Sequence, residues 1–358
     1  MKIFIDIGHP GHVHYFKNFY FIMINNGHDF LITARDKPII CELLETYGIP
    51  YLNRGRGKDS KFGKLLYMLQ ADVFLIKKFL NFKPDISISF SSPYAAQTSF
   101  LFNVPHIALN DTEHTDKVHS RFTYPFSKAI ITPQSYQNNL GAKHIRFNNV
   151  VESLYLHPTK FSPNQDIYTF LGIESTQHFA IVRFVSWNAF HDVGQGGFTL
   201  VQKREIVRYL SSKMRVFISS EGTLDEEFSE FQISIPPDKM HDALSFASLF
   251  VGESGTMASE SSLLGTPAIY VNSLPLMCYL KLEKENDLLY HFTDGDNVLE
   301  FLTGISDFPM FKLSCTNKLK HMVSDFVNPT DFLIWFVANY PKSFDILKAD
   351  PDYQYNIS

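Results

Sequence analysis

The stretch LFVGESGTMASESSLLGTPAIYVNS, residues 249–273, decides the fold of this chain. Its apolar start, SLFVGESG, predicts a buried strand over 248–255, and TMASESSLLG predicts a helix over 256–265 that ends at Gly265. TPAIYVN then predicts a second strand. A strand, a helix and a strand in this order form a βαβ unit, which is typical of a parallel sheet.

The turn between this strand and helix predicts an anion-binding site. The strand brings Glu253, Ser254 and Gly255 to its carboxyl end, where the helix presents free N–H groups and the positive end of its dipole. Ser254 and Thr256 add hydroxyl donors. Glu260 follows about one turn later, where its carboxylate can accept hydrogen bonds from two ribose hydroxyls. The structural alternative is that Ser254 only caps the helix and Glu260 is a solvated carboxylate.

Similar strand and helix patterns alternate along the chain, so we expect an α/β protein with two doubly wound, Rossmann-like domains that face each other across a cleft. At 358 residues, the chain has about twice the length of one domain. The predicted domains are 1–156 and 169–328, and the anion-binding turn lies in the second. The polar segment 157–168 is the predicted linker. The segment 329–358 holds a last helix that could pack back on the first domain.

The individual elements follow from apolar runs, helical spacing and glycine stops. In the first domain, strands are predicted over 2–8, 28–36, 49–55, 85–90, 104–110 and 128–133, and helices over 12–27, 37–48, 61–82, 93–103 and shortly before Gly141. In the second domain, strands are predicted over 179–184, 214–220, 248–255 and 266–272, and helices over 199–212, 240–247 and 256–265.

Composition argues against several classes of function. The net charge of −5 argues against a general nucleic-acid binder, and the 3 scattered cysteines show no metal-ligand spacing and fit a reducing compartment. Asp6 and His9 interrupt the first apolar run, so no signal peptide is predicted, and no segment has the roughly 18 apolar residues that span a bilayer. We expect a cytoplasmic protein. Peripheral membrane contact through the lysine-bearing helix at 61–82 is an alternative to a solvated helix face.

A turn rich in glycine and histidine follows the first strand, where ligands of open α/β sheets bind. It contains Gly8, His9, Gly11, His12 and His14. No acidic ligand lies nearby, so we expect no metal. His12 is a candidate general base or phosphate donor, with His9 and Gly11 beside it in the substrate loop. At least one of these histidines is expected to be structural.

Two further polar runs follow predicted strands. In NDTEHT, Asp111 and Glu113 are candidates for a catalytic base and His114 for a ligand contact; a solvated loop is the alternative. In VRFVSWNAFHDVGQGG, Arg183 can grip a diphosphate with two hydrogen bonds. The candidate contacts that follow it are Ser186, Trp187 and Asn188, and the alternative places Trp187 in the core and pairs Arg183 with a carboxylate.

The segment 249–271 resembles the nucleotide-sugar motif of GT-B enzymes. It is similar to that of UDP-N-acetylglucosamine 2-epimerases and of glycosyltransferases of the peptidoglycan lipid-intermediate type. The resemblance implies that Ser254, Gly255 and Thr256 hold the diphosphate and that Glu260 holds the ribose. The whole chain also resembles an uncharacterised family of GT-B-like bacterial and archaeal proteins.

Two departures from the epimerase pattern separate the possible reactions. Glu113 lies where the epimerases carry a functional acid, but NDTEHT lacks their His-x-Glu-Ala-Gly pattern. The run after Arg183 lacks their His-Arg-Arg-Glu cluster. The leading expectation is therefore a metal-independent GT-B glycosyltransferase for surface polysaccharide assembly. It would need no cofactor beyond its substrates, a nucleotide-sugar that is UDP-linked by resemblance and a glycan or lipid-linked acceptor. The alternatives are a non-hydrolysing 2-epimerase and a non-catalytic nucleotide-sugar-binding protein.

Overall fold

The computed structural model describes residues 1–57, 61–185, 197–220, 222, 224–273, 282–283 and 287–357. Contacts divide the chain into two units. Unit 1 comprises Met1–Lys160 and Phe326–Ser358, and unit 2 comprises Phe161–Asp325. The chain therefore leaves unit 1, forms all of unit 2 and returns to unit 1. The first crossing lies inside the segment 157–168, where the linker was predicted.

Unit 1 is built on a parallel sheet in the order β3-β2-β1-β4-β5-β6-β7, as far as the described residues show. This order reverses direction between β1 and β4, which makes the sheet doubly wound. The strands are β1 (Lys2–Ile7), β2 (Asp29–Ala34), β3 (Leu52–Asn53), β4 (Ile86–Ser89), β5 (His106–Leu109), β6 (Ala129–Pro133) and β7 (His144–Phe147). The helices are α1 (Pro10–Asn25), α2 (Pro38–Thr46), α3 (Lys61–Phe82), α4 (Pro93–Leu101), α5 (Asp116–Phe122), α6 (Ser153–Leu156), α13 (Pro329–Ala338) and α14 (Lys342–Ala349).

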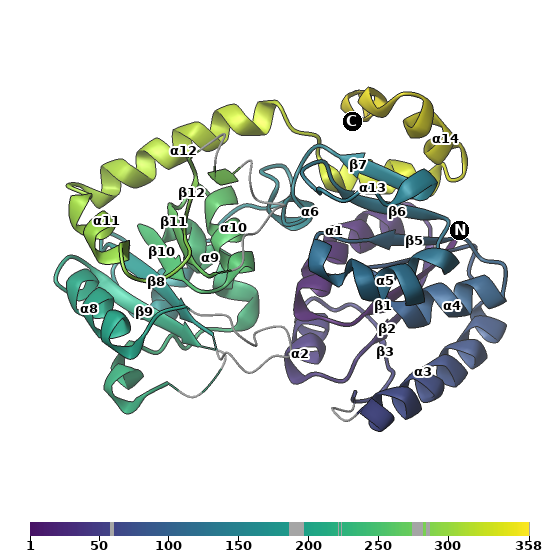
Figure 1. Cartoon of the computed structure of the whole chain (residues 1–358), viewed down its shortest axis with the longest axis horizontal. Helices are drawn as coiled ribbons and strands as arrows, with labels where there is room; N and C mark the ends of the chain where they lie inside the picture. The colour runs from purple at the N-terminus through teal and green to yellow at the C-terminus, as the bar shows by residue number, and fades with distance from the viewer. Residues whose placement is uncertain are drawn as a thin grey trace. The chain divides into compact units, whose positions relative to one another are not determined.

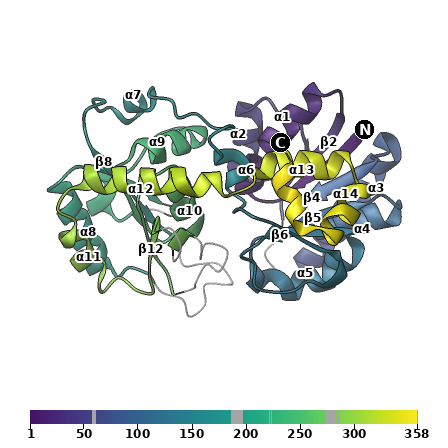
Figure 2. The ribbon, with the colours of Figure 1, turned by 90° about the horizontal axis from the view of Figure 1, so that it is seen from above.

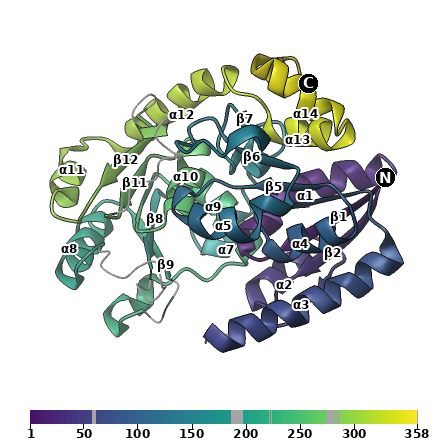
Figure 3. The same cartoon turned by 45° about the vertical axis from the view of Figure 1, so that its right-hand side comes forward.

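The central strand β1 is buried on both faces because helices cover both sides of the sheet. Its residues Ile3, Phe4 and Ile5 are fully buried, as expected for a central strand of a parallel sheet. On one face, Phe4 packs with Leu75 of α3 and with α4. The long helix α3 lies beside α4 along this face (Figure 3).

The C-terminal helices belong to unit 1. In Figure 2 the yellow helix α13 lies beside α6, and it contacts α1 and α6. The buried hydroxyl of Thr330 donates to the carbonyl oxygen of Leu154 at 2.6 Å, and the amide N–H of Asn148 donates to the side-chain oxygen of Gln354 at 2.7 Å. The end of the chain thus completes the layer next to β7.

Unit 2 is a second parallel sheet, in the order β12-β11-β10-β8-β9 within the described part of the chain. Its winding reverses between β8 and β10. The strands are β8 (Phe179–Phe184), β9 (Arg215–Ser220), β10 (Leu249–Gly252), β11 (Ala268–Val271) and β12 (Leu289–Phe292). The helices are α7 (Ile167–Leu171), α8 (Leu200–Ser211), α9 (Met240–Phe246), α10 (Gly255–Leu263), α11 (Val298–Gly304) and α12 (Phe308–Ser324).

Helices cover both faces of the unit 2 sheet (Figure 1). On one face, α8 and α11 bury Leu210 and Leu302 against Val182 and Val251 of the sheet. Helix α10 contacts α9 and the strands that flank it. The prediction of two doubly wound α/β folds is confirmed.

The structure corrects three local predictions. The helix predicted over 12–27 begins at Pro10, because His9 caps it and proline is favoured at the first helical position, so Gly11 lies in the first turn and not in a loop. The helix predicted before Gly141 is wrong: residues 134–140 form turns and irregular chain, and a single 3-10 turn, Gly141–Lys143, follows them. Strands β7 and β12 were not predicted, because histidine or arginine interrupts their sequences, HIRF and LYHF, so neither shows an apolar run.

Candidate functional site

The turn after β10 lies at the switch point of the unit 2 sheet, which is where open α/β sheets bind ligands. Ser254 is the N-cap of α10, and its hydroxyl accepts the N–H of Met257 at 3.4 Å. Ser254 and Gly255 are half-buried, and Thr256 is exposed. Capping and anion binding are compatible here, because the cap uses one N–H and the first turn of a helix has several to offer.

Glu260 is a buried residue and not a solvated one. Its side chain is buried, and Oε1 lies 3.0 Å from Nε2 of His241 on α9, which is also buried. The surface alternative for Glu260 is therefore wrong. The role of His241 could not be predicted, because it lies in the apolar helix pattern MHDALSFA and meets Glu260 only through the packing of α9 on α10.

The carboxylate of Glu253 accepts hydrogen bonds from two main-chain N–H groups. One oxygen accepts the N–H of Val185 at 2.9 Å and the other accepts the N–H of Phe198 at 2.8 Å. One buried carboxylate therefore links the chain just after β8 to the chain just before α8. Lys203 lies 3.9 Å from the same carboxylate.

Arg183 lies near the end of β8, next to β10. Its Nη1 donates to the hydroxyl of Ser219 on β9 at 2.6 Å. The neighbouring position on β10 is Gly252, where a Cβ atom would lie 2.7 Å from Cβ of Arg183, so only glycine allows the two strands to approach here. The other predicted contacts in this region, Ser186, Trp187 and Asn188, lie outside the described residues.

A pocket of about 660 Å³ opens at the corresponding place in unit 1, the carboxyl ends of β1 and β4. Its lining comes from β1, from the turns after β1, β2, β3 and β4, and from helices α1, α3, α4 and α5. The volume suits a small organic ligand. Three residues of the predicted substrate turn, Gly8, His9 and His12, line it.

The histidines after β1 have different environments. His9 is exposed and accepts the N–H of Gly11 at 3.2 Å. Burial lowers the pKa of His12 well below its ordinary value, and the nearby His9, Arg54 and Lys37 lower it further. Nδ1 of His12 accepts the N–H of Gly8 at 3.3 Å. A neutral imidazole that accepts at Nδ1 carries its hydrogen on Nε2, so His12 offers a donor. His14 is buried against Tyr155.

The floor of the pocket is a buried ion pair that sequence reasoning missed. Asp6, within β1, accepts hydrogen bonds from Nε of Arg54 at 2.7 Å and from the hydroxyls of Thr33 at 2.7 Å and Ser92 at 2.6 Å. Arg54 also pairs with the hydroxyl of Tyr67. The one available signal was an aspartate in the middle of the apolar run IFIDI, because a charge in a buried strand needs a partner.

The third predicted cluster follows β5. Asp111 is half-buried, and burial raises its pKa to about 6, with a contribution from Glu113. The hydroxyl of Thr112 donates to Asp111 at 2.6 Å. Glu113 accepts the N–H of Gln137 at 3.1 Å, while His114 is exposed. A carboxyl group with a pKa near the working pH is suited to accept a proton.

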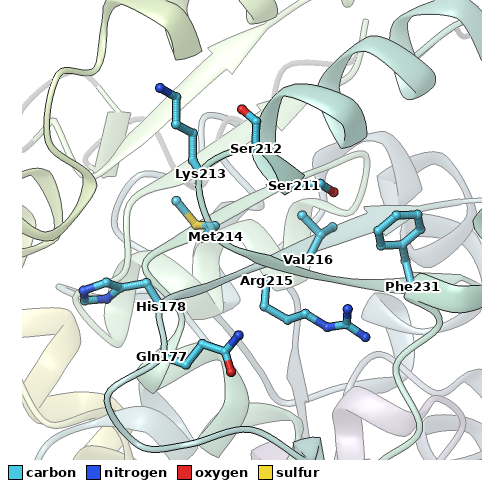
Figure 4. Close-up of a pocket in the computed structure, with 9 residues that line it drawn as sticks. All are labelled: Gln177, His178, Ser211, Ser212, Lys213, Met214, Arg215, Val216 and Phe231. Atoms are coloured by element: carbon cyan, nitrogen blue, oxygen red, sulfur yellow. The ribbon is translucent and has the colours of Figure 1, made fainter.

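Another hollow lies at the opposite, amino-terminal edge of the unit 2 sheet. Figure 4 shows the side chains around this pocket of about 440 Å³, among them His178 before β8 and Arg215 at the start of β9. Ligands of parallel sheets bind at the carboxyl ends of the strands, so we do not place the functional site there.

Two searches of the described residues bear on metals and membranes. No group of three or more histidine, cysteine, aspartate or glutamate side chains in that part of the chain could hold a metal ion. None of the helices described combines the length and apolar character needed to cross a bilayer.

Several solved structures share the fold. A UDP-GlcNAc 2-epimerase from Neisseria meningitidis, bound to UDP-GlcNAc, superposes with a TM-score of 0.60 at 12% identity over 90% of this chain and 99% of its own. An S. aureus protein solved with UDP, MnaA, gives 0.65 at 11% identity over 97% of each chain. The spinosyn rhamnosyltransferase SpnG with thymidine diphosphate gives 0.56 at 13% identity over 95% of this chain and 100% of its own. The GT-B-like fold is thus confirmed.

At the level of sequence, residues 1–342 match the family described as "Protein of unknown function (DUF354)". An uncharacterised protein of Methanocaldococcus jannaschii is 25% identical over 96% of this chain and 99% of its own length. The similarity therefore extends over both units.

Proposed function

The chain belongs to the DUF354 family and has a GT-B-like fold, and from its sites we propose that it is a metal-independent glycosyltransferase that uses a nucleoside-diphosphate sugar. Unit 2 binds the nucleotide and unit 1 binds the acceptor. The solved relatives named above carry UDP, UDP-GlcNAc or thymidine diphosphate, which favours this class of donor. The acceptor is a glycan or a lipid-linked precursor, and the protein works in surface polysaccharide assembly.

The observation that carries the proposal is the turn after β10. It combines the open first turn of α10 with a glutamate, Glu260, that His241 holds in place. The helix N-terminus stabilises the diphosphate, and Glu260 accepts hydrogen bonds from the ribose. Arg183, at the end of β8 on the other side of the switch point, adds a cation for the leaving diphosphate.

Transfer needs an acceptor oxygen to replace the diphosphate on the sugar. The acceptor hydroxyl bonds to the anomeric carbon while the bond from that carbon to the diphosphate oxygen breaks, and the diphosphate leaves with the electron pair. We assign the acceptor's proton to Asp111, because it follows β5, the neighbour of β4 at the same carboxyl edge of the sheet as the pocket, and because its raised pKa suits a base. His12 donates a hydrogen bond from Nε2 in the acceptor pocket, since its Nδ1 accepts from Gly8.

Thermal melts with nucleotides test the donor site. A nucleoside diphosphate at about 100 times its dissociation constant should stabilise the protein by roughly 2.7 kcal/mol. The decisive variant is Thr256→Asp, because an acidic residue at an exposed helix N-terminus favours the helix but repels a diphosphate. We expect an unchanged melting temperature without ligand and a lost response to UDP. Glu205→Ala, an exposed glutamate on α8, is the control and should keep the response.

Turnover assays separate transfer from the other reactions. Release of UDP from a UDP-sugar that depends on an added acceptor supports a transferase. Interconversion of the sugar without any acceptor would identify an epimerase instead. Binding with neither activity, unchanged in Asp111→Asn, would identify a binding protein. A failure of every nucleotide to shift the melting temperature would remove the proposal altogether.

A further inference from the structure

The guanidinium of Arg35 is a positive charge in the wall of the 660 Å³ pocket, and no counter-ion pairs with it in the described structure. Arg35 follows β2 directly and lines the pocket with its side chain. Among the described residues, its guanidinium makes no ion pair or hydrogen bond, and its Nε is shielded from solvent. A shielded guanidinium nitrogen without an acceptor loses the hydrogen bonds that water would have supplied.

The other arginine of the pocket is already neutralised. Asp6 lies 2.7 Å from Nε of Arg54, and the rings of Tyr67 and Tyr94 lie against the Arg54 guanidinium. The floor of the pocket therefore carries no net charge from this pair. The positive charge of Arg35 remains for whatever enters the pocket.

The main chain fixes the position of Arg35. At Gly57, which also lines the pocket, a Cβ atom would lie 2.4 Å from Nη2 of Arg35. That distance is too short for non-bonded atoms, so the guanidinium packs directly on the glycine backbone. Because Gly57 has no side chain, the Arg35 guanidinium can occupy this position in the pocket wall.

Most of the remaining wall is apolar or aromatic. Phe90 and Pro93 come from the β4–α4 turn, and Val118 and Phe122 come from α5. Val118 is 57% exposed and Phe122 is 39% exposed, so the apolar surface continues to the rim. A ligand that fits this pocket has an anionic group at one end and an apolar body at the other.

We propose that the unit 1 pocket binds an organic phosphate, with the phosphate on Arg35 and the apolar body against Phe90 and Phe122. The planar guanidinium can donate two parallel hydrogen bonds to phosphate oxygens, and Nε2 of His12 supplies a third donor from the same pocket. The inference rests on the proposed function, because it makes this ligand the acceptor. An acceptor of this class is a phosphate ester, lipid-linked or aromatic, that also carries the hydroxyl to which the sugar is transferred.

Calorimetric titration of the full chain tests the assignment. The probes are geranyl phosphate, phenyl phosphate, inorganic phosphate and the neutral alcohol geraniol. Geranyl phosphate binding more tightly than phenyl phosphate would identify a lipid source, and the reverse order an aromatic one. We expect organic phosphates to bind at least about tenfold more tightly than geraniol or inorganic phosphate, and Arg35→Gln to remove about tenfold of this affinity.

Two further variants separate position from charge. Gly57→Ala keeps the charge of Arg35 but displaces its guanidinium, so it should also weaken organic phosphates. Arg56→Gln removes a neighbouring arginine that is exposed and does not line the pocket, so it should bind like the wild type. The unfolding midpoints of all three variants establish that they are folded.

Equal affinity of Arg35→Gln and wild type for geranyl phosphate would overturn the inference. Equal binding of geraniol and geranyl phosphate would overturn it too, and so would loss of the UDP response in Arg35→Gln, since that would assign Arg35 to the donor. A UDP response that persists without organic phosphate binding removes only this inference. Organic phosphate binding without any nucleotide response keeps the anion site and removes the proposed function.

Discussion

Nε2 of His241 lies 3.0 Å from Oε1 of Glu260, and both side chains are buried between α9 and α10 of unit 2. A buried carboxylate held in this way has a fixed orientation, which a ribose contact requires. His241 is therefore a positioning residue for Glu260.

Replacing His241 should cost stability as well as nucleotide affinity. We expect His241→Ala to lower the free energy of unfolding by about 1–3 kcal/mol, because a buried hydrogen-bond partner of Glu260 is lost. Urea denaturation measures this, with His321→Ala, an exposed histidine on α12, as the control. A His241→Gln variant that restores the stability and UDP binding together would support positioning, and full nucleotide affinity in His241→Ala would refute it.

Loss of Asp6 should be among the most damaging single changes in unit 1. Asp6→Ala leaves the Arg54 guanidinium buried without its carboxylate, and breaking a buried pair in this way costs about 3–5 kcal/mol. The matched control is Glu227→Ala, which breaks an arginine–carboxylate pair with Arg204 that is exposed. Thermal melts should show a large decrease for the first variant and almost none for the second. Similar decreases for both would contradict the structure.

The pH dependence of turnover should identify the base. Burial raises the pKa of Asp111 to about 6, so the ionised form that accepts a proton accumulates as the pH rises through about 6. The rate should therefore rise through this range and reach a plateau, and Asp111→Asn should abolish the activity. If Asp111→Asn retains activity and its rate still rises near pH 6, the base is another group.

The raised pKa of Asp111 predicts the opposite pH dependence for stability: stability should fall where the rate rises. The folded protein holds the Asp111 proton more strongly than the unfolded chain, so the contribution of this group to stability falls as the pH rises from about 4 to about 6. The free energy of unfolding is measured against pH for the wild type and for Asp111→Asn. The variant should lack this decrease. An increase in the same range would mean that the carboxyl group has a lowered pKa.

The hydroxyl of Thr330 ties the C-terminal helices to the body of unit 1. Thr330→Val keeps the shape but removes the hydrogen bond to the carbonyl of Leu154. Because the side chain of Asn18 also donates to that carbonyl, the loss should be only about 1 kcal/mol. Denaturant titration checks this, and Thr303→Val, an exposed threonine of α11, should change nothing.

The parts of the fold that could be predicted are those with long, strong periodic patterns. The strand–turn–helix at 248–265 was predicted to within a few residues, because an apolar run, a polar turn and a glycine stop all agree there. The strands β7 (HIRF) and β12 (LYHF) were not found in this way, because polar side chains interrupt their apolar residues.

The partners of the predicted site residues could not be deduced, because they come from distant segments. Arg54 meets Asp6 only because β3 and β1 flank β2 in the sheet. Arg35 acquires its place in the pocket through the backbone of Gly57. Strand order and close packing of this kind are tertiary information that residue patterns do not contain.

The insertion of unit 2 into unit 1 sets an order for folding during synthesis. Unit 2 is continuous in sequence, so all of it is synthesised, and leaves the ribosome, ahead of α13 and α14. Until then the N–H of Asn148 lacks its bond to Gln354, and the carbonyl of Leu154 lacks its bond to Thr330. Unit 2 can therefore complete its sheet on the nascent chain, whereas unit 1, although begun first, is finished last.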